Sequence, residues 1–256
     1  MLNLIVDQSR TRQVSVCMAT HNGAAYLNEQ IESILVQLGV EDELLISDDQ
    51  SSDETVHLIQ TFGDPRIRFL GTQRFNSAVL NFEHALRHAT GQYIFLADQD
   101  DVWMPDKVAR MISELQSVDL VVSDCTFINE NGALIGESYY EAYRSGKGVV
   151  KNFIKNTYLG NCMAFRRSVL TKILPFPDAL YKASQLALYH DVWIGLVANI
   201  WFRVRFIPDK LSAYRRHGAN ASPTGISAKS PNSISTKMKS RYLLATGLLG
   251  RLFRFY

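Results

Sequence analysis

Short apolar runs alternate with helical repeats along the first half of this 256-residue chain, and this alternation limits the possible fold more than any other feature. The apolar runs predict strands at 14–18, 43–47, 67–70, 93–97 and 120–123. Apolar residues at helical spacing predict helices at 24–38, 54–61, 79–89 and 105–115. Such alternation is typical of right-handed βαβ units. We therefore expect an α/β, Rossmann-like fold with a mostly parallel central sheet flanked by helices.

The alternation weakens beyond about residue 125. Residue patterns there still predict strands at 161–165 and 202–207 and a helix at 190–200. Residues 222–235 are rich in Ser, Pro and Gly, which is typical of a linker or loop, and helical spacing returns over 237–256. We expect the second half to form a smaller region beside the main α/β unit.

The charges are unevenly distributed. From residue 210 onward the chain has nine Lys and Arg residues and no Asp or Glu, whereas the first 209 residues carry 18 basic and 25 acidic groups. A basic end on an acidic body favours contact with something anionic. The segment 237–256 has the composition of an amphipathic helix on an anionic membrane surface, and packing on the α/β domain or on a second subunit is the alternative. Nucleic acid is disfavoured as a partner because the aromatic residues do not interleave with the basic ones.

Composition also indicates the cellular compartment of the protein. No run of about 18 apolar residues predicts a transmembrane helix, and the first ten residues lack a signal-peptide core. The cysteines Cys17, Cys125 and Cys162 form no CxxC pair, which fits a reducing compartment. We expect a cytoplasmic protein, with peripheral contact at the inner face of the membrane if the C-terminal segment binds lipid.

Polar clusters follow three of the predicted strands, at 20–22, 48–49 and 98–101. Ligands bind beyond the carboxyl ends of strands in such sheets, so we expect the clusters to share one crevice. The three carboxylates within 98–101 suit Mg²⁺ or Mn²⁺. Each cluster has a structural alternative: a solvated turn with Asp101 capping the next helix, an Asx-turn at 48–49, and a plain strand-to-helix turn at 20–23.

Several common site motifs are absent from the chain. It has no GxGxxG after the first strand, no GxxxxGK[ST] and no GxSxG. These absences disfavour a dinucleotide-dependent oxidoreductase, a P-loop nucleotide hydrolase and an α/β-hydrolase.

Five strings carry a family resemblance: VSVCMATHNG (14–23), ELLISDDQSSDET (43–55), YIFLADQDDVW (93–103), HDVW (190–193) and AYRRHGAN (213–220). In order and spacing the chain resembles glycosyltransferase family 2, whose members have the GT-A fold, over roughly residues 13–220. DQDDVW with a later YRxHG resembles the bacterial branch that builds surface polysaccharides, in which many enzymes are rhamnosyltransferases.

The resemblance implies roles for individual residues. The nucleotide-binding set would be Thr20, His21, Asn22, Asp49, Asn76, Asp98 and Arg215. Asp100 would hold Mg²⁺ or Mn²⁺ on the donor diphosphate, and His217 would be a second metal ligand. Asp191 would be the catalytic base, and an acid favoured by the dipole at a helix N-terminus is its structural alternative.

The resemblance also implies a domain plan and a reaction. Residues 1–220 would form the GT-A domain, with a nucleotide-binding half at about 13–125 and an acceptor half at about 126–220, and 221–256 would form a linker and a basic C-terminal segment. The enzyme would be an inverting, metal-dependent glycosyltransferase that uses a nucleotide-sugar donor and a saccharide or lipid-linked acceptor in surface-polysaccharide synthesis. We expect dTDP-L-rhamnose as donor, with a UDP-hexose as the alternative; a non-catalytic sugar-nucleotide-binding domain is the competing hypothesis.

The acceptor side is the least defined part of the sequence. Asn161, Cys162 and Met163 are candidates for lining the acceptor cleft. Six aromatic residues offer either sugar-stacking faces or core packing: Tyr139, Tyr140, Tyr143, Tyr158, Trp193 and Trp201.

Overall fold

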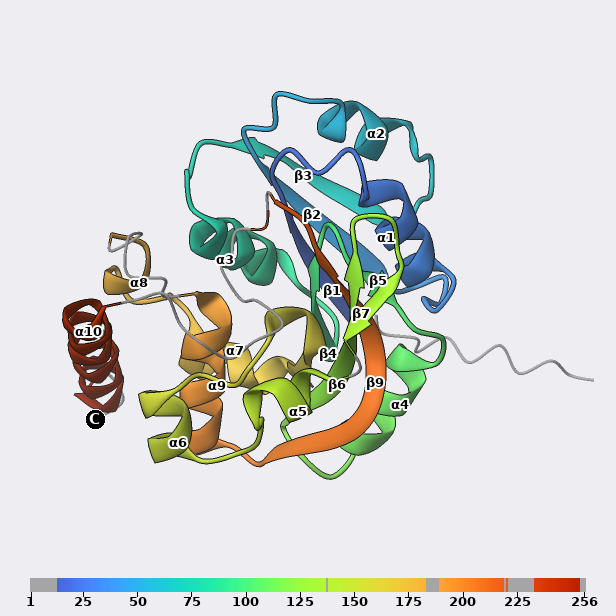
Figure 1. Cartoon of the computed structure of the whole chain (residues 1–256). Coiled ribbons are helices and arrows are strands. Elements are labelled where there is room, and N and C mark those ends of the chain that lie inside the picture. Colours follow the sequence, from blue (N-terminus) through green and yellow to red (C-terminus); the bar gives the residue numbers. More distant parts are fainter. Residues whose placement is uncertain (1–12, 137, 183–188, 219, 221–232, 254–256) are drawn as a thin grey trace, which may run out of the picture.

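The computed structural model describes residues 13–136, 138–182, 189–218, 220 and 233–253 (Figure 1). Most of the expected linker, residues 222–232, and the last three residues of the expected C-terminal helix lie outside this described part.

A nine-stranded sheet forms the centre of the molecule. Its main path runs β3 (Ile67–Gln73), β2 (Glu43–Asp49), β1 (Val14–Thr20), β4 (Tyr93–Asp98), β8 (Met163–Arg166), β6 (Leu120–Asn129), β9 (Val204–Arg216) and β5 (Val102–Trp103), and β7 (Leu134–Gly136) pairs with β6. The first four strands on this path are parallel, and so are β6 and β9. The short strands β5, β7 and β8 pair antiparallel with their neighbours. Both halves of the chain therefore contribute to one continuous sheet.

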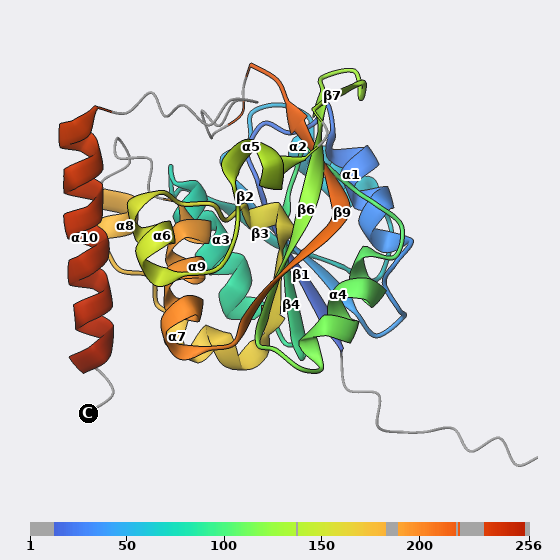
Figure 2. The ribbon, with the colours of Figure 1, turned by 60° about the horizontal axis from the view of Figure 1, so that its bottom comes forward.

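Helices cover both faces of the sheet (Figures 1 and 2). One hydrophobic cluster joins α1 (Leu27–Leu35), α2 (Thr55–Thr61) and α4 (Lys107–Leu115) to alternate residues of β1 such as Val16. A second cluster joins α3 (Ala78–His88), α5 (Tyr139–Tyr143) and α9 (His190–Trp201) to Cys17, which points to the other face. Successive strand residues face opposite sides, so each apolar run supplies both layers. Full burial of one such side chain contributes about 1.5–3 kcal/mol.

The remaining elements are short, except the last. They are α6 (Val149–Ile154), η1 (Gly160–Cys162), η2 (Arg167–Val169), α7 (Leu170–Ile173), α8 (Ala179–Lys182) and α10 (Ile234–Phe253). Figure 2 shows α10 lying along the flank of the molecule that carries α6 and α8. Within the described part of the chain, no helix combines the length and the apolar character needed to cross a bilayer.

The fold class and the strand–helix order predicted from the sequence are confirmed. The helix expected at 105–115 begins only at Lys107, because Asp106 adopts a left-handed conformation with φ 64°. The strand at 102–103 was not expected, because its partners Ser212 and Ala213 come from a segment far along the chain.

The six candidate sugar-stacking aromatic residues take the core-packing alternative. Tyr139, Tyr143, Tyr158 and Trp193 are buried, and Tyr140 and Trp201 pack against the same cluster.

Candidate active site

The loops after β1 and β2 are joined by hydrogen bonds. The carboxylate of Asp48 accepts a hydrogen bond from the Thr20 hydroxyl at 2.9 Å and from the Ser51 backbone N–H at 3.0 Å. The Asp48 carboxylate thus shapes the turn after β2, although its bond reaches three residues on, and not the two of an Asx-turn. Thr20 is itself buried, so its hydroxyl acts here to hold the loop.

Asp49 points toward the loop that precedes α3. Its two oxygens accept hydrogen bonds from the backbone N–H groups of Phe75, Asn76 and Ser77 at 2.8, 3.0 and 2.8 Å. Asn76 adopts φ 48° and is exposed. Asp49 and Asn76 thus lie together, and the carboxylate fixes the shape of the loop that carries the exposed amide.

His21 and Asn22 are the exposed members of the β1 loop. The Nδ1 atom of His21 lies 2.5 Å from the Asp49 carbonyl oxygen. The Oδ1 atom of Asn22 accepts the backbone N–H of Ser52 at 2.8 Å, and Asn22 adopts φ 49°. These contacts bring four candidate nucleotide-binding residues, Asn76, Asp49, His21 and Asn22, to one edge of the sheet.

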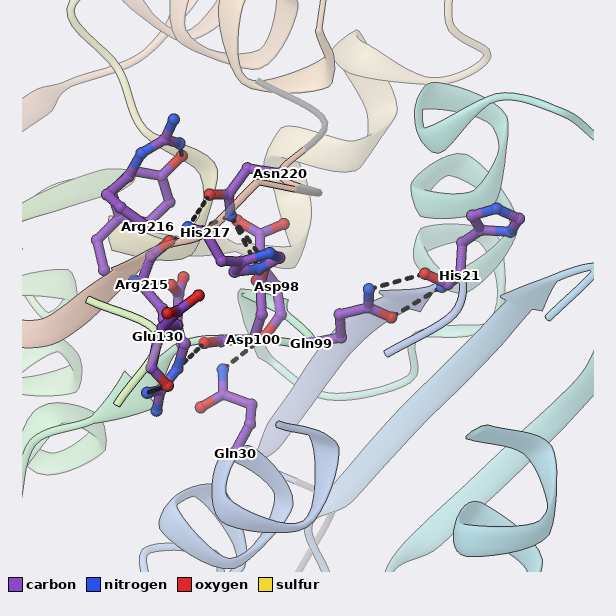
Figure 3. Close-up of polar contacts among 12 residues, drawn as sticks. His21, Gln30, Asp98, Gln99, Asp100, Glu130, Arg215, Arg216, His217 and Asn220 are labelled. Atoms are coloured by element: carbon purple, nitrogen blue, oxygen red, sulfur yellow. Dashed lines mark hydrogen bonds and ion pairs between the residues drawn. The ribbon is translucent and has the colours of Figure 1, made fainter. Parts of the chain in front are cut away.

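The acidic loop, residues 98–101 after β4, lies against the edge of the sheet that carries the β1 loop (Figure 3). The amide of Gln99 forms two hydrogen bonds with the backbone of His21, at 2.8 and 2.9 Å. The Nε2 atom of Gln30 on α1 donates to the Asp98 carbonyl at 2.8 Å. The loop that carries Asp98 and Asp100 therefore lies beside the loop after β1, at the same edge of the sheet as the loop after β2.

Arg215, near the end of β9, binds the acidic loop from the side opposite the β1 loop. Its guanidinium is buried and donates to the carbonyl of Asp100 at 2.8 Å and to the carboxylate of Glu29 at 2.5 Å. It also donates to the carbonyls of Asn129 and Glu130 at 3.3 Å. The resemblance implied a role for Arg215 in nucleotide binding, and four of its five guanidinium N–H groups bond to protein oxygen atoms here. In this structure Arg215 positions the loop.

Asp100 meets the segment that follows β9. Its Oδ2 atom lies 2.8 Å from Nε2 of His217 and accepts a hydrogen bond from the Asn220 amide at 3.0 Å (Figure 3). The two candidate metal ligands, Asp100 and His217, are thus direct neighbours although they are 117 positions apart.

The carboxyl groups of Asp98 and Asp191 both have raised pKa values. Burial, together with the charges of Asp100 and Asp191, raises the pKa of Asp98 to about 7. Burial also raises the pKa of Asp191 to about 7, although hydrogen bonds from the Val192 N–H and the Asn156 side chain act in the opposite direction. A carboxylate with a pKa near neutrality suits proton transfer at the pH of the cell.

Asp191 lies in the first turn of α9, so its structural alternative also fits the location. The preceding residue, His190, is buried against Phe82, with ring centroids 3.8 Å apart. Gly160 leaves room for that imidazole, because a Cβ atom there would lie 2.7 Å from its Nε2 atom. This packing fixes the start of α9 and therefore the place of the Asp191 carboxylate.

Asp101 differs from its neighbours. It is fully buried, accepts the Arg215 backbone N–H at 2.8 Å and contacts the Asn161 amide. Lys107 donates to the Asn161 carbonyl and to the Ser212 hydroxyl, both at 2.5 Å. The idea that Asp101 caps the next helix in a solvated turn is wrong, because α4 begins six residues later and the side chain is enclosed. Asn161, proposed for the acceptor cleft, is buried in this network.

The side chains of Asp100 and His217 suit a hard divalent cation whose other ligands come from a substrate. Among the described residues, no group of three or more His, Cys, Asp and Glu side chains is arranged to hold a metal ion. Mg²⁺ and Mn²⁺ need few protein ligands where phosphate oxygens and water complete the shell. The adjacent Asp100 carboxylate and His217 imidazole fit such a partial site.

Gln99, Gln30 and Asn220 were not assigned roles from the sequence. Each is a neutral side chain in a loop or on a helix, with no periodicity or charge to mark it. Gln99 and Asn220 lie inside the strings DQDDVW and AYRRHGAN, which was the available signal.

Comparison with known proteins adds the family. Residues 15–174, more than half of the chain, match the model described as Glycosyl transferase family 2. An uncharacterized glycosyltransferase of Nostoc is 26% identical over 242 residues, covering 88% of this chain and 71% of the relative.

Two further relatives have specific names. The UDP-Glc:alpha-D-GlcNAc-diphosphoundecaprenol beta-1,3-glucosyltransferase WfgD of Escherichia coli is 31% identical and covers 48% of this chain. The dTDP-rhamnosyl transferase RfbG of Shigella flexneri is 34% identical and covers 37% of this chain. The chain aligns with 49% of the length of WfgD and 35% of RfbG.

Solved structures share the fold. TarS 1–349 of S. aureus in complex with UDP-GlcNAc aligns with a TM-score of 0.62 and 16% identity, over 83% of this chain and 61% of that structure. The mannosyltransferase PcManGT of Pyrobaculum calidifontis, in complex with GDP-Man and Mn²⁺, aligns with a TM-score of 0.56 and 20% identity, over 80% of this chain and 57% of that structure.

Proposed function

The chain belongs to glycosyltransferase family 2, and on this premise we propose that it is an inverting, metal-dependent enzyme of surface-polysaccharide synthesis. It moves a sugar from a nucleotide-diphosphate donor to a saccharide or lipid-linked acceptor. The observation that carries the proposal is the 2.8 Å contact between the Asp100 carboxylate and the His217 imidazole. The same loop carries Asp98, which lies close enough to Asp191 for the charge of Asp191 to raise the pKa of Asp98.

The nucleotide lies at the edge formed by the loops after β1, β2 and β4. His21 and Asn22, both exposed, and Asn76 face the base, and Asp49 holds the loop of Asn76. Asp98 accepts hydrogen bonds from the ribose hydroxyls. We assign residues 13–125 to this donor half and about 126–220 to the acceptor half of one domain that extends over residues 1–220.

Asp100 and His217 would hold Mg²⁺ or Mn²⁺, and the bound cation would supply stabilisation of the negative charge on the leaving diphosphate. Arg215 and Asn220 keep the Asp100 backbone and carboxylate in place. The Mn²⁺ named in the mannosyltransferase structure supports a divalent cation in this fold.

Asp191 acts as the base. The acceptor oxygen forms a bond to the anomeric carbon while the bond from that carbon to the diphosphate oxygen breaks, and the hydroxyl proton passes to the Asp191 carboxylate. A single displacement of this kind inverts the anomeric centre, and general base catalysis contributes about 10²–10⁴-fold.

dTDP-L-rhamnose is the proposed donor, and a UDP-hexose is the alternative. The name of RfbG supports the first, and the name of WfgD supports the second and a lipid-linked acceptor. Calorimetric titration with dTDP, UDP and GDP, each with Mn²⁺ or with EDTA, tests the nucleotide. Transfer from the matching donor, with the anomeric configuration of the product read by NMR, tests the reaction. Retention of configuration would refute the single displacement.

Helix α10 is the proposed membrane-contacting segment. One face packs on the domain, where Leu244 is buried and Arg251 donates to the carbonyl of Leu174 at 3.0 Å. The opposite face leaves apolar side chains exposed along one stripe, formed by Ile234, Met238, Tyr242, Leu249 and Leu252. The helix has no acidic residue and carries Lys237, Lys239 and Arg241. The expectation of docking on the catalytic domain therefore holds for one face, and an anionic lipid surface complements the other.

Flotation with vesicles of neutral and anionic phospholipid tests this contact. The triple variant Met238→Ser, Tyr242→Ser, Leu249→Ser should lose most of the vesicle-bound fraction. A control variant, Val36→Ser with Val40→Ser, removes two exposed apolar side chains elsewhere and should still bind. Equal flotation of both variants would refute the membrane contact. Concentration-dependent dimerisation of the wild type that only the triple variant abolishes would assign the stripe to a second copy of the chain.

A further inference from the structure

Gln99 makes an unusual contact for a side chain between two acidic residues. Its Oε1 atom accepts the His21 N–H at 2.8 Å, and its Nε2 atom donates to the His21 carbonyl at 2.9 Å. The side-chain amide thus pairs with both polar groups of one residue, as the partner residue does in an antiparallel β ladder. Figure 3 shows these two bonds bridging the loops after β1 and β4.

A glycine makes room for this contact. A Cβ atom on Gly23 would lie 2.2 Å from Oε1 and 2.4 Å from Cδ of Gln99. The Gly23 backbone is not in the left-handed region, so the backbone itself would accept alanine. The missing side chain at residue 23 is therefore required by the Gln99 amide.

The two loops joined in this way carry different parts of the proposed site. His21 is exposed and its ring contacts the Asp49 carbonyl, on the side assigned to the base. Gln99 lies between Asp98 and Asp100, on the side assigned to the ribose and the diphosphate. Gln30 and Arg215 also hold the acidic loop through its carbonyl oxygens, but they connect it to α1 and β9 rather than to the loop after β1.

We propose that Gln99 is a positioning residue that sets the spacing between the nucleobase loop and the acidic loop, so that one nucleoside diphosphate reaches both. The inference rests on the proposed function, because it concerns the nucleotide that the site would bind. Gln99 acts through the His21 backbone.

A double-mutant cycle with Gln99→Ala and Gly23→Ala tests the inference in the full-length chain. The probes are dTDP and UDP, titrated calorimetrically in the presence of Mn²⁺, and the thermal midpoint is measured for each variant. We expect Gln99→Ala to weaken nucleotide binding about tenfold, as the loss of a pair of hydrogen bonds predicts. Gly23→Ala should weaken binding to a similar extent because it displaces the amide. The double variant should bind no more weakly than Gln99→Ala, because the clash disappears with the side chain.

Gln116→Ala is the matched control. Gln116 donates to the Tyr93 hydroxyl at the opposite end of β4, at 2.7 Å, so its loss should leave nucleotide affinity unchanged. Amide hydrogen exchange without ligand adds a direct measure, since the His21 N–H should exchange faster in Gln99→Ala.

The outcomes separate the two proposals. Nucleotide affinity of Gln99→Ala within twofold of a wild type that binds, or a Gly23→Ala effect that adds fully to that of Gln99→Ala, would overturn this inference alone. A wild type that binds no nucleoside diphosphate would overturn the proposed function and this inference with it.

Discussion

Replacement of Asp191 by Asn should separate the catalytic interpretation of this residue from the structural one, because they predict opposite changes in stability. Asp191 is 8% exposed, and burial raises its pKa from 3.8 to about 7. Between those two values the folded state holds a proton that the unfolded state releases, so the free energy of unfolding falls as the pH rises. The ionised Asp191 carboxylate therefore lowers the free energy of unfolding at neutral pH.

The magnitude follows from the two pKa values. Each pKa unit corresponds to 1.36 kcal/mol. Relative to a pH at which Asp191 is protonated in both states, the free energy of unfolding is therefore lower by about 4 kcal/mol at pH 8 and by about 2 kcal/mol at pH 5.5. Asn keeps an oxygen for the Val192 N–H and carries no charge. We therefore expect Asp191→Asn to stabilise the protein, by about 4 kcal/mol at pH 8 and about half of that at pH 5.5. The charge of Asp191 also raises the pKa of Asp98, so its removal acts in the same direction.

Urea unfolding of both proteins at pH 5.5 and pH 8, combined with turnover, provides the measurement. Turnover of the wild type should rise with pH through about 7, as Asp191 ionises, and Asp191→Asn should lose about 10²–10⁴-fold while its donor affinity remains. An acid kept only for the helix dipole would give the reverse, a loss of about 0.3–1 kcal/mol of stability. A destabilised variant with normal turnover would refute the assignment.

The other predictions concern the metal and the packing. Asp100→Asn should abolish the gain in nucleotide affinity that Mn²⁺ gives the wild type, a change of about tenfold or more by calorimetry, and an undiminished gain would assign the metal elsewhere. Gly195→Ala should cost about 1–3 kcal/mol, because its Cβ atom would lie 2.5 Å from the Tyr158 ring, and thermal unfolding should show it as a lower midpoint. Gly250→Ala meets nothing within 4 Å and should stabilise α10 by about 0.5–1 kcal/mol, so a loss there would contradict the packing described.

Local pattern determined the main elements. The runs that became β1, β2 and β4 are apolar on both faces, which is what a strand covered by helices on both sides requires. The acidic loop at 98–101 could be located because carboxylates directly after a buried strand are costly unless something balances them. These features depend on neighbours in the sequence and can therefore be recognised there.

Tertiary structure decided which of these side chains remain exposed and which are bonded within the protein. Asp101 and Asp48 have the same residue type as the candidate site residues Asp100 and Asp49, yet their carboxylates are bonded within the protein, as is the guanidinium of Arg215. No local pattern distinguishes them, because burial and hydrogen-bond partners are set by segments that are distant in the chain.

The sequence by itself determined an α/β sheet with carboxylates at its strand ends and a basic C-terminal helix. Only the tertiary structure decided that His217 meets Asp100 across 117 positions, that Gln99 meets His21 across 78, and that one face of α10 remains exposed. The physical reason is that periodicity records which side of an element is buried, whereas a contact between distant loops depends on how the whole sheet twists and closes.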